Sequence, residues 1–286
     1  MQEINQTLEI GRPNYLKVQR DSDYGLYLSA QNLEEVLLPN AYVIDKEMPV
    51  GATVKVFVYT DSEDRPVATT TFPYAMLDEY GYFTVVDYKS YGAFVNWGLP
   101  KDLFVPLSQQ KEYFHIGKKY ILRVCLDHET GRLYATQKIG KWLSYKPQSL
   151  VKNQTVDALV LSKTPLGYKL IINNLYEGML FDNEIFEPLS IGERRQVYIK
   201  NVRSDGKLDL SLQPIGKKAT TELYEEKLEK RLREEGGYIP LNTKSDPESI
   251  VDTFGLSKKS FKRTLNTLIE QNRVELYHDG IRLTSL

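Results

Sequence analysis

Long apolar runs are absent from this sequence, and no stretch approaches the 18 or so residues that a membrane-spanning helix needs. The N-terminus also lacks the basic segment, apolar stretch and small-residue site of a secretory signal. We therefore expect a cytoplasmic protein that has no membrane partner.

Cysteine and histidine are scarce. The single Cys125 has no intramolecular disulfide partner, and its place in the apolar run "YILRVCL" predicts a small core residue. The three histidines, His115, His128 and His278, are scattered and offer no zinc spacing. We therefore expect no metal site and no other cofactor.

Motifs of catalysis are missing as well. The chain contains no Walker loop, dinucleotide fingerprint, HExxH or nucleophile elbow. Its paired acids lie in turn-like stretches such as "DSDYG" and "DSEDR", where carboxylates are usually solvated or cap the turn. We expect a protein that is not an enzyme and has no catalytic residues. A nuclease built from carboxylates far apart in sequence stays open at this point.

Excess charge of either sign is also absent, because 37 basic and 38 acidic residues leave a net charge of −1. This balance argues against a protein that coats polyanions indiscriminately. The balance is uneven, however, with six basic against eleven acidic residues in 1–74 and a slight basic excess in every later segment. A polyanion-binding surface is therefore expected past residue 75.

What the sequence does contain is one pattern in three copies. In each copy a glycine precedes a proline or phenylalanine by 14 residues: Gly25 and Pro39, Gly92 and Pro106, Gly167 and Phe181. A second glycine follows the first after 25 or 26 residues and opens an alternating apolar strand: Gly51, Gly117 and Gly192. Five short strands in about 70 residues are typical of an OB-fold barrel. The pattern predicts three tandem all-β barrels: residues 1–74, 75–143 and 144–216.

The middle copy reads "YGAFV…LFVPLS…IGKKYILRV…TGRLYATQK" and resembles the S1 domain, an RNA-binding OB-fold. Pro39 and Pro106 stand where that family often has histidine. In S1 domains, the residues before and two after the first glycine and the residue at the histidine position line the nucleic-acid face. Carried over, these are Tyr91, Phe94 and Pro106 in the second copy, Tyr24, Tyr27 and Pro39 in the first, and Leu166, Lys169 and Phe181 in the third.

The aromatic pair of the middle copy raises a geometric question. Tyr91 and Phe94 are three residues apart, so a regular strand would turn them to opposite faces and leave one ring in the core. A bulge near Gly92 would instead bring both rings outward, where they would form a stacking surface. The basic residues Lys89 and Lys101 flank this strand and are candidate phosphate contacts.

From residue 217 to residue 286, the apolar residues no longer alternate with a period of two but recur at the three- to four-residue spacing of helices. Thr220 or Thr221 is the expected N-cap of a helix that ends at Gly236, and Asp246 and Ser257 are expected to cap two further helices. A hairpin is expected at 279–280. This order resembles a winged helix, an α+β domain. The exposed face of its third helix would carry Lys259, Lys262 or Arg263, and Asn266, which either contact nucleic acid or are simply solvated.

Three S1-like barrels followed by a winged helix resemble the bacterial conserved virulence factor B or YitL-like family. The resemblance implies a cytoplasmic RNA-binding protein that affects gene expression. We expect single-stranded RNA as the partner, held by stacking and basic contacts. Two alternatives remain: a DNA-binding transcription factor led by the winged helix, and a scaffold that docks on the ribosome or another protein complex.

Overall fold

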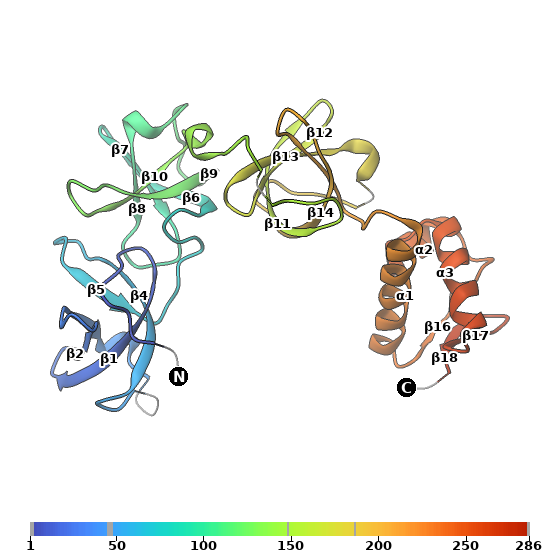
Figure 1. Cartoon of the computed structure of the whole chain (residues 1–286), viewed down its shortest axis with the longest axis horizontal. Coiled ribbons are helices and arrows are strands. Elements are labelled where there is room, and N and C mark those ends of the chain that lie inside the picture. Colours follow the sequence, from blue (N-terminus) through green and yellow to red (C-terminus); the bar gives the residue numbers. More distant parts are fainter. Residues whose placement is uncertain (1–2, 45–47, 148, 186, 285–286) are drawn as a thin grey trace. The chain divides into compact units, whose positions relative to one another are not determined.

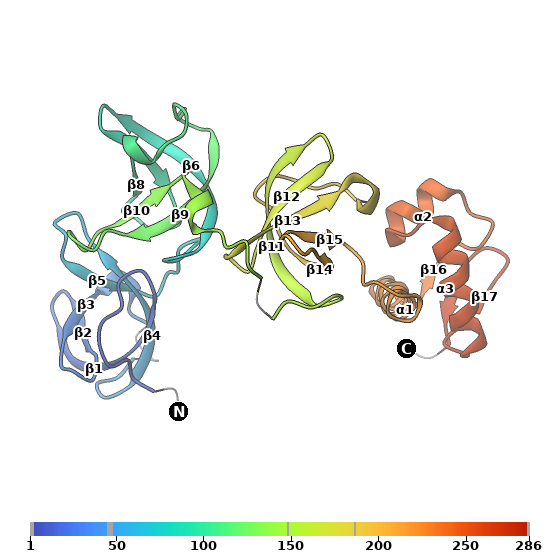
Figure 2. The same cartoon turned by 45° about the horizontal axis from the view of Figure 1, so that its top comes forward.

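The computed structural model of the chain describes residues 3–44, 48–147, 149–185 and 187–284. The chain divides into two compact units, residues 1–143 and 144–286. The first unit holds two β-barrels, and the second holds a third barrel and a helical C-terminal region (Figures 1 and 2). Among the described residues, no helix is long and apolar enough to span a membrane.

Each of the three barrels contains five strands and closes on itself. The strands of the first are β1 (Pro13–Ser22), β2 (Gly25–Ser29), β3 (Glu35–Pro39), β4 (Thr53–Thr60) and β5 (Pro66–Thr69). Those of the second are β6 (Tyr80–Lys89), β7 (Gly92–Asn96), β8 (Leu103–Pro106), β9 (Lys119–Leu126) and β10 (Leu133–Thr136). Those of the third are β11 (Thr155–Thr164), β12 (Gly167–Ile172), β13 (Tyr176–Phe181), β14 (Arg194–Val202) and β15 (Leu208–Ser211). All three share one strand order, in which the fifth strand lies between the third and the fourth, so the predicted tandem barrels are confirmed.

Strand register explains the 14-residue spacing. The first glycine of each copy lies directly opposite the proline or phenylalanine across the hairpin: Gly25 opposite Pro39, Gly92 opposite Pro106 and Gly167 opposite Phe181. A Cβ atom at any of these glycines would collide with the carbonyl oxygen of the residue before its partner. Only glycine therefore lets the two strands approach this closely.

The second glycine of each copy closes a turn onto the first strand. The N–H groups of Gly51, Gly117 and Gly192 donate to the carbonyls of Val18, Val85 and Val160, respectively, over 2.8–2.9 Å. At each of these valines the pairing of the first strand with the second shifts by one residue. The three barrels thus share the position of this register shift as well as their strand order.

Each barrel has a buried apolar core, and the second core extends into the first barrel. Phe57 and Tyr59 of β4 belong to the same buried cluster as Trp97 of the second barrel. Phe57 and Trp97 pack edge to face with ring centroids 5.9 Å apart. Cys125 is buried, as predicted, and this burial raises the pKa of its thiol. The first two barrels are therefore joined by apolar packing.

The C-terminal region is an α+β domain with a three-stranded sheet of order β16-β18-β17. Its elements are α1 (Lys217–Glu234), β16 (Tyr238–Ile239), α2 (Pro247–Phe254), α3 (Lys258–Glu270), β17 (Val274–Leu276) and β18 (Ile281–Leu283). Asp246 and Ser257 cap α2 and α3 as predicted, each accepting a hydrogen bond from the backbone N–H three residues later. The predicted cap at Thr220 or Thr221 is wrong: α1 already begins at Lys217, because lysine and alanine favour helix and extend it N-terminally.

Candidate nucleic-acid interface

A row of side chains crosses the outer face of the second barrel, one from each strand. The residues pair in register from β6 through β7, β8 and β10 to β9: Asp87, Phe94, Phe104, Tyr134 and Cys125, the last of which is buried although it lies outside the apolar cluster of the barrel. Their neighbours Val95, Leu103 and Val105 are buried, as expected where alternate residues of a strand face opposite sides. Three adjacent members of this row are aromatic.

Tyr91 joins the row from the turn that precedes β7. Its ring centroid lies 6.2 Å from that of Phe94 and 5.8 Å from that of Phe104, while the Phe94 and Phe104 centroids are 5.3 Å apart. The Tyr91 ring is 59% exposed, and the two phenylalanines are half-buried. We call Tyr91, Phe94, Phe104 and Tyr134 the aromatic platform.

The sequence leaves open whether a bulge near Gly92 turns both rings outward, and the structure has no register shift there. The irregularity lies across the hairpin in β6, between Val85 and Asp87. Tyr91 belongs to a turn and not to β7, so the alternation of a strand does not apply to it. The turn carries the Tyr91 ring to the side where Phe94 points, and both rings meet there without a bulge in their own strand.

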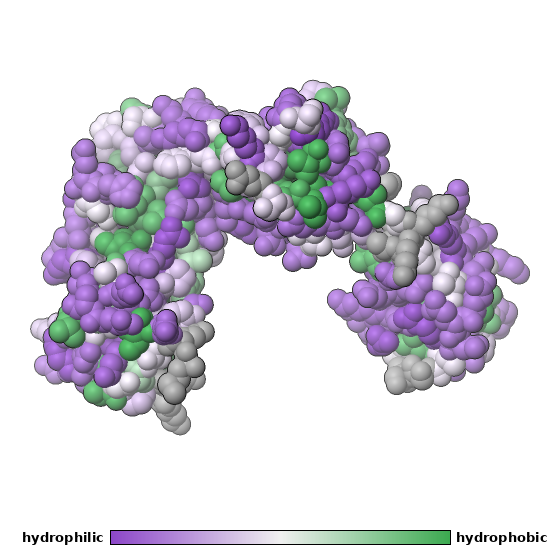
Figure 3. Space-filling model, viewed as in Figure 1, coloured by the Kyte–Doolittle hydropathy of each residue, from purple (hydrophilic) through white to green (hydrophobic). Residues whose placement is uncertain are grey.

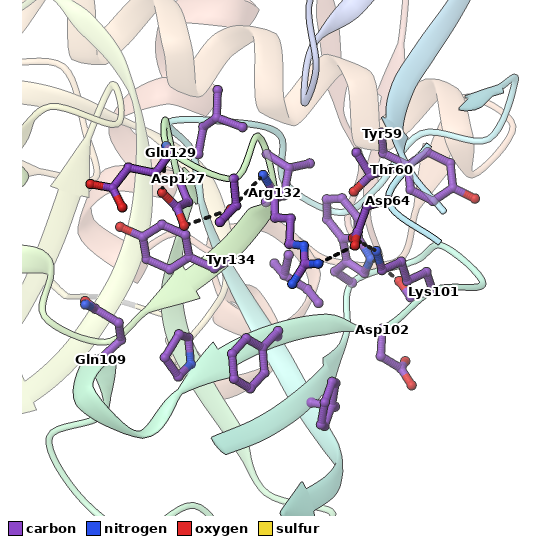
Figure 4. Close-up of a pocket in the computed structure, with 18 of the residues that line it drawn as sticks. Tyr59, Thr60, Asp64, Lys101, Asp102, Gln109, Asp127, Glu129, Arg132 and Tyr134 are labelled. Atoms are coloured by element: carbon purple, nitrogen blue, oxygen red, sulfur yellow. Dashed lines mark hydrogen bonds and ion pairs between the residues drawn. The ribbon is translucent and has the colours of Figure 1, made fainter. Parts of the chain in front are cut away.

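The aromatic platform lines a groove of about 1060 Å³ within the first unit (Figure 4). The predicted residues Tyr91, Phe94, Pro106 and Lys101 all line it. Residues that were not predicted line it too: Phe104, Tyr134, Trp142, Arg132 and Lys141 from the second barrel and its C-terminal end, and Tyr59 and Asp64 from the first barrel. Phe104 and Tyr134 pair across the parallel β8 and β10, a neighbourhood that sequence spacing does not indicate.

The charged side chains at this face are mostly paired. Lys89 forms an ion pair of 2.8 Å with Asp87, which lowers the pKa of Asp87 and raises that of Lys89. Lys101 donates to the backbone carbonyl of Asp61 over 2.6 Å. Lys141 lies 4.9 Å from the Trp142 ring centroid at the edge of the groove. Of the two lysines predicted to contact phosphate, only Lys101 lines the groove, and it already has partners in the first barrel.

Asp102 precedes β8 and lines the same groove, with its side chain exposed and partly desolvated by the groove wall. Burial, with a smaller effect from Asp87, raises the pKa of Asp102. The carboxyl group of Asp102 adds to the acidic side chains of this groove, which also include Asp64 and Asp127.

The corresponding row of the first barrel is Arg20, Tyr27, Leu37, Val67 and Tyr59. The guanidinium carbon of Arg20 lies 3.5 Å from the Tyr27 ring centroid and covers that face. At the other end Tyr59 is buried in the cluster shared with the second barrel, and burial raises its pKa to about 12. Tyr24 is 76% exposed. The rings of Tyr27 and Tyr59 in this row are therefore already covered by other side chains of the protein.

The third barrel presents a charged row: Ser162, Lys169, Met179, Asp209 and Asn201. Lys169 pairs with Glu177 over 2.9 Å, and Arg203 pairs with Asp209 over 2.7 Å. Phe181 lies beside the row, half-buried, with the Arg203 guanidinium 5.9 Å from its ring centroid. Leu166 is exposed in the position that Tyr91 takes in the second barrel. None of the five residues in this row is aromatic.

In the winged helix, α3 buries Phe261, Leu265 and Leu268 and exposes the opposite face. The four predicted polar residues lie on that exposed face: Lys259, Lys262, Arg263 and Asn266. The basic residues among them form no ion pair within the part of the chain that the structure describes, whereas Arg273 is held by Glu225 and Glu229. In the space-filling view the surface of this domain is largely hydrophilic (Figure 3). The described residues also contain no group of three potential metal ligands.

Three closed five-stranded barrels and a C-terminal winged helix define a multidomain protein of OB-like barrels and a winged helix. Residues 10–71 match the S1 domain family, and residues 226–283 match the CvfB-like winged helix domain family. The chain is related over almost its whole length to the conserved virulence factor B and YitL proteins, so the resemblance predicted from the sequence is confirmed.

The individual relatives are as follows. The chain is 27% identical over 280 residues to the uncharacterized protein YitL of Bacillus subtilis. The aligned region covers 92% of this chain and 90% of that protein. It is 26% identical over 283 residues to conserved virulence factor B of Staphylococcus aureus strain USA300, with 96% and 94% covered. A crystal structure of a multidomain protein with nucleic acid binding domains from Streptococcus pneumoniae aligns with 22% identity and a TM-score of 0.41, over 96% of this chain and 98% of that one. The family matches support nucleic-acid binding as the class of function.

Proposed function

We propose that this protein binds single-stranded RNA and acts in the cytoplasm as a regulator of gene expression without catalysing a reaction. The observation that carries the proposal is the aromatic platform, with three rings within 6.2 Å of one another on the open face of a barrel. Exposed rings on an OB barrel are the usual means of binding unpaired bases, because every base has a π face.

The geometry suits stacking rather than readout of a duplex. A groove of about 1060 Å³ lined by aromatic rings accommodates splayed bases, which a paired helix does not present. Stacking accepts RNA and DNA bases alike, so the choice of RNA rests on the S1 match of the first barrel, whose strand order the second barrel shares. Phosphates would lie toward Lys141 and the other basic residues of the groove.

The test is a titration of the full chain with fluorescent oligoribonucleotides across a range of salt concentrations. We expect saturable binding at about 50 mM salt that weakens as salt rises. The double variant Tyr91→Ala/Phe94→Ala should lose most of it. Tyr113→Ala removes an equally exposed ring that lies outside the groove, and this control should bind like the parent protein. Unchanged binding by the double variant would refute the proposal.

A second candidate function is binding of duplex DNA by the winged helix. It is favoured by the exposed Lys259, Lys262, Arg263 and Asn266 on α3. Lys262→Ala/Asn266→Ala in the full chain should then abolish duplex binding, and single-stranded RNA should compete poorly. Tight RNA binding that this variant does not alter would favour the barrel instead.

A further inference from the structure

The turn between β4 and β5 of the first barrel reaches the two basic residues at the rim of the groove. Asp64 pairs with Arg132, and its other carboxylate oxygen lies 3.8 Å from Nζ of Lys101. The same ammonium group donates to the carbonyl of Asp61 over 2.6 Å. Figure 4 shows Asp64 between Arg132 and Lys101. One acidic side chain therefore neutralises two cations of the second barrel.

The turn is held in shape without the side chain of Asp64, although the backbone N–H of Asp64 donates to the carbonyl of Asp61 over 3.0 Å. The Asp61 carboxylate accepts the backbone N–H groups of Glu63 and Arg65 over 2.8 and 3.0 Å, and it also binds the Arg65 guanidinium. Glu63 pairs with Arg65 over 2.9 Å. Asp64 itself has a positive φ of 65°, a conformation that asparagine and aspartate tolerate better than most residues. Its carboxylate is thus the part of the turn directed at the neighbouring barrel.

The contact between the two barrels also has other supports. The apolar cluster joins Phe57 and Tyr59 to Trp97, and Arg12 of the first barrel pairs with Asp78 at the start of the second. Exposed ion pairs add at most about 1 kcal/mol to stability. The side chains of Arg132 and Asp64 are 58% and 36% exposed. Holding the barrels together does not depend on this ion pair.

We propose that Asp64 limits the affinity of the groove by occupying Lys101 and Arg132 in place of a nucleic-acid phosphate. The inference rests on the proposed function and extends it. Both cations line the same groove as the aromatic platform, so a strand stacked on the platform brings its phosphates within reach of them. A phosphate must then displace the Asp64 carboxylate to pair with either cation. The first barrel acts here as a competitor of nucleic acid rather than as a second binding module.

Asp64→Asn is the informative variant, because asparagine keeps the shape and the positive φ of the turn and removes only the charge. With Arg132 released and Lys101 held only by the neutral carbonyl of Asp61, binding of an oligoribonucleotide at about 50 mM salt should become roughly tenfold tighter. The salt dependence should steepen by about 0.7 in logarithmic slope for each additional phosphate that the released cations neutralise. Glu63→Gln is the matched control, since Glu63 lies in the same turn but pairs only with Arg65.

Adding Arg132→Gln to Asp64→Asn distinguishes the proposal from the alternative that Asp64 acts only by holding the two barrels together. If released Arg132 supplies the tighter binding, the double variant should lose most of the improvement, whereas a loosened barrel contact would leave binding insensitive to Arg132. Unchanged or weaker binding by Asp64→Asn overturns the inference and leaves the proposed function intact, provided that Tyr91→Ala/Phe94→Ala still abolishes binding. A parent protein that binds no oligonucleotide overturns both.

Discussion

Phe94 and Phe104 lie side by side on β7 and β8, with ring centroids 5.3 Å apart and ring planes inclined by 38°. They pair directly in register, so their spacing is set by the sheet and not by flexible side chains. A pair of rings held this way forms a preformed surface for bases, because little side-chain freedom is lost when a base stacks on it.

Phe104→Ala should therefore weaken binding of single-stranded RNA about 5- to 150-fold, the equivalent of the ~1–3 kcal/mol that one stacked base contributes. The ring is half-buried and faces the groove, so the barrel core beneath it stays filled. A fluorescence anisotropy titration measures the effect. Tyr113→Ala serves as the control, because the Tyr113 ring is 62% exposed yet does not line the groove. Equal losses in both variants would mean that the groove is not the binding face.

The position of Phe104 in the groove shows where sequence reasoning reaches its limit. The glycine and proline spacing predicts a hairpin, and that hairpin places Gly92 opposite Pro106 as expected. The spacing contains no information on the parallel pairing of β8 with β10, because that contact joins strands separated by another strand. Phe104 and Tyr134 become members of the platform only through this pairing.

The orientation of Tyr91 was also beyond the sequence. Alternation along a strand is a sound rule for residues in a strand, but the boundary between turn and strand decides whether it applies. Tyr91 lies one residue outside β7, and the bulge is in the opposite strand. The caps of α2 and α3, in contrast, were predicted correctly because capping depends on residues next to one another in the chain.

Gly92→Ala should destabilise the second barrel by about 1–3 kcal/mol, the usual cost of forcing an extra carbon into a packed site. The added Cβ would collide with the carbonyl oxygen of Val105 and approach the Phe104 ring. Thermal unfolding followed by tryptophan fluorescence measures the change, since Trp97 lies in the core of this barrel. Gly140→Ala is the matched control, because nothing lies within 4 Å of its added Cβ. Equal midpoints for the two variants would contradict the register argument.

The N-cap of α2 should make the stability of the winged helix depend on pH. Hydrogen bonds from the side chain and backbone of Ser249 lower the pKa of Asp246 from its ordinary 3.8. A lowered carboxyl pKa stabilises the folded state above pH 3.8, and this contribution is lost as pH falls through the depressed pKa.

Asp246→Asn keeps a capping oxygen but does not titrate, so it should unfold a few degrees below the parent protein at neutral pH and at the same temperature in acid. Helical circular dichroism follows this transition, since α1, α2 and α3 all belong to this domain. A difference between the two proteins that persists well below the lowered pKa of Asp246, where its carboxyl group is protonated in the folded state, would show that the charge is not responsible.

The first barrel should contribute little to binding although it carries the same aromatic pair. Tyr27 is covered by Arg20 at 3.5 Å, and the far end of its row is buried against the second barrel through Tyr59. Tyr24 remains exposed, but no second ring of the row is free to stack beside it. Residues 1–74 are also acidic, and their negative charge repels phosphate.

Tyr24→Ala/Tyr27→Ala should therefore weaken RNA binding by less than about threefold, well below the loss expected for a single stacking contact in the second barrel. Parallel titrations of this variant and of Tyr91→Ala/Phe94→Ala make the comparison. A loss of the same size in both would show that the two barrels form one continuous stacking surface, and that the Arg20 guanidinium moves aside when a base arrives.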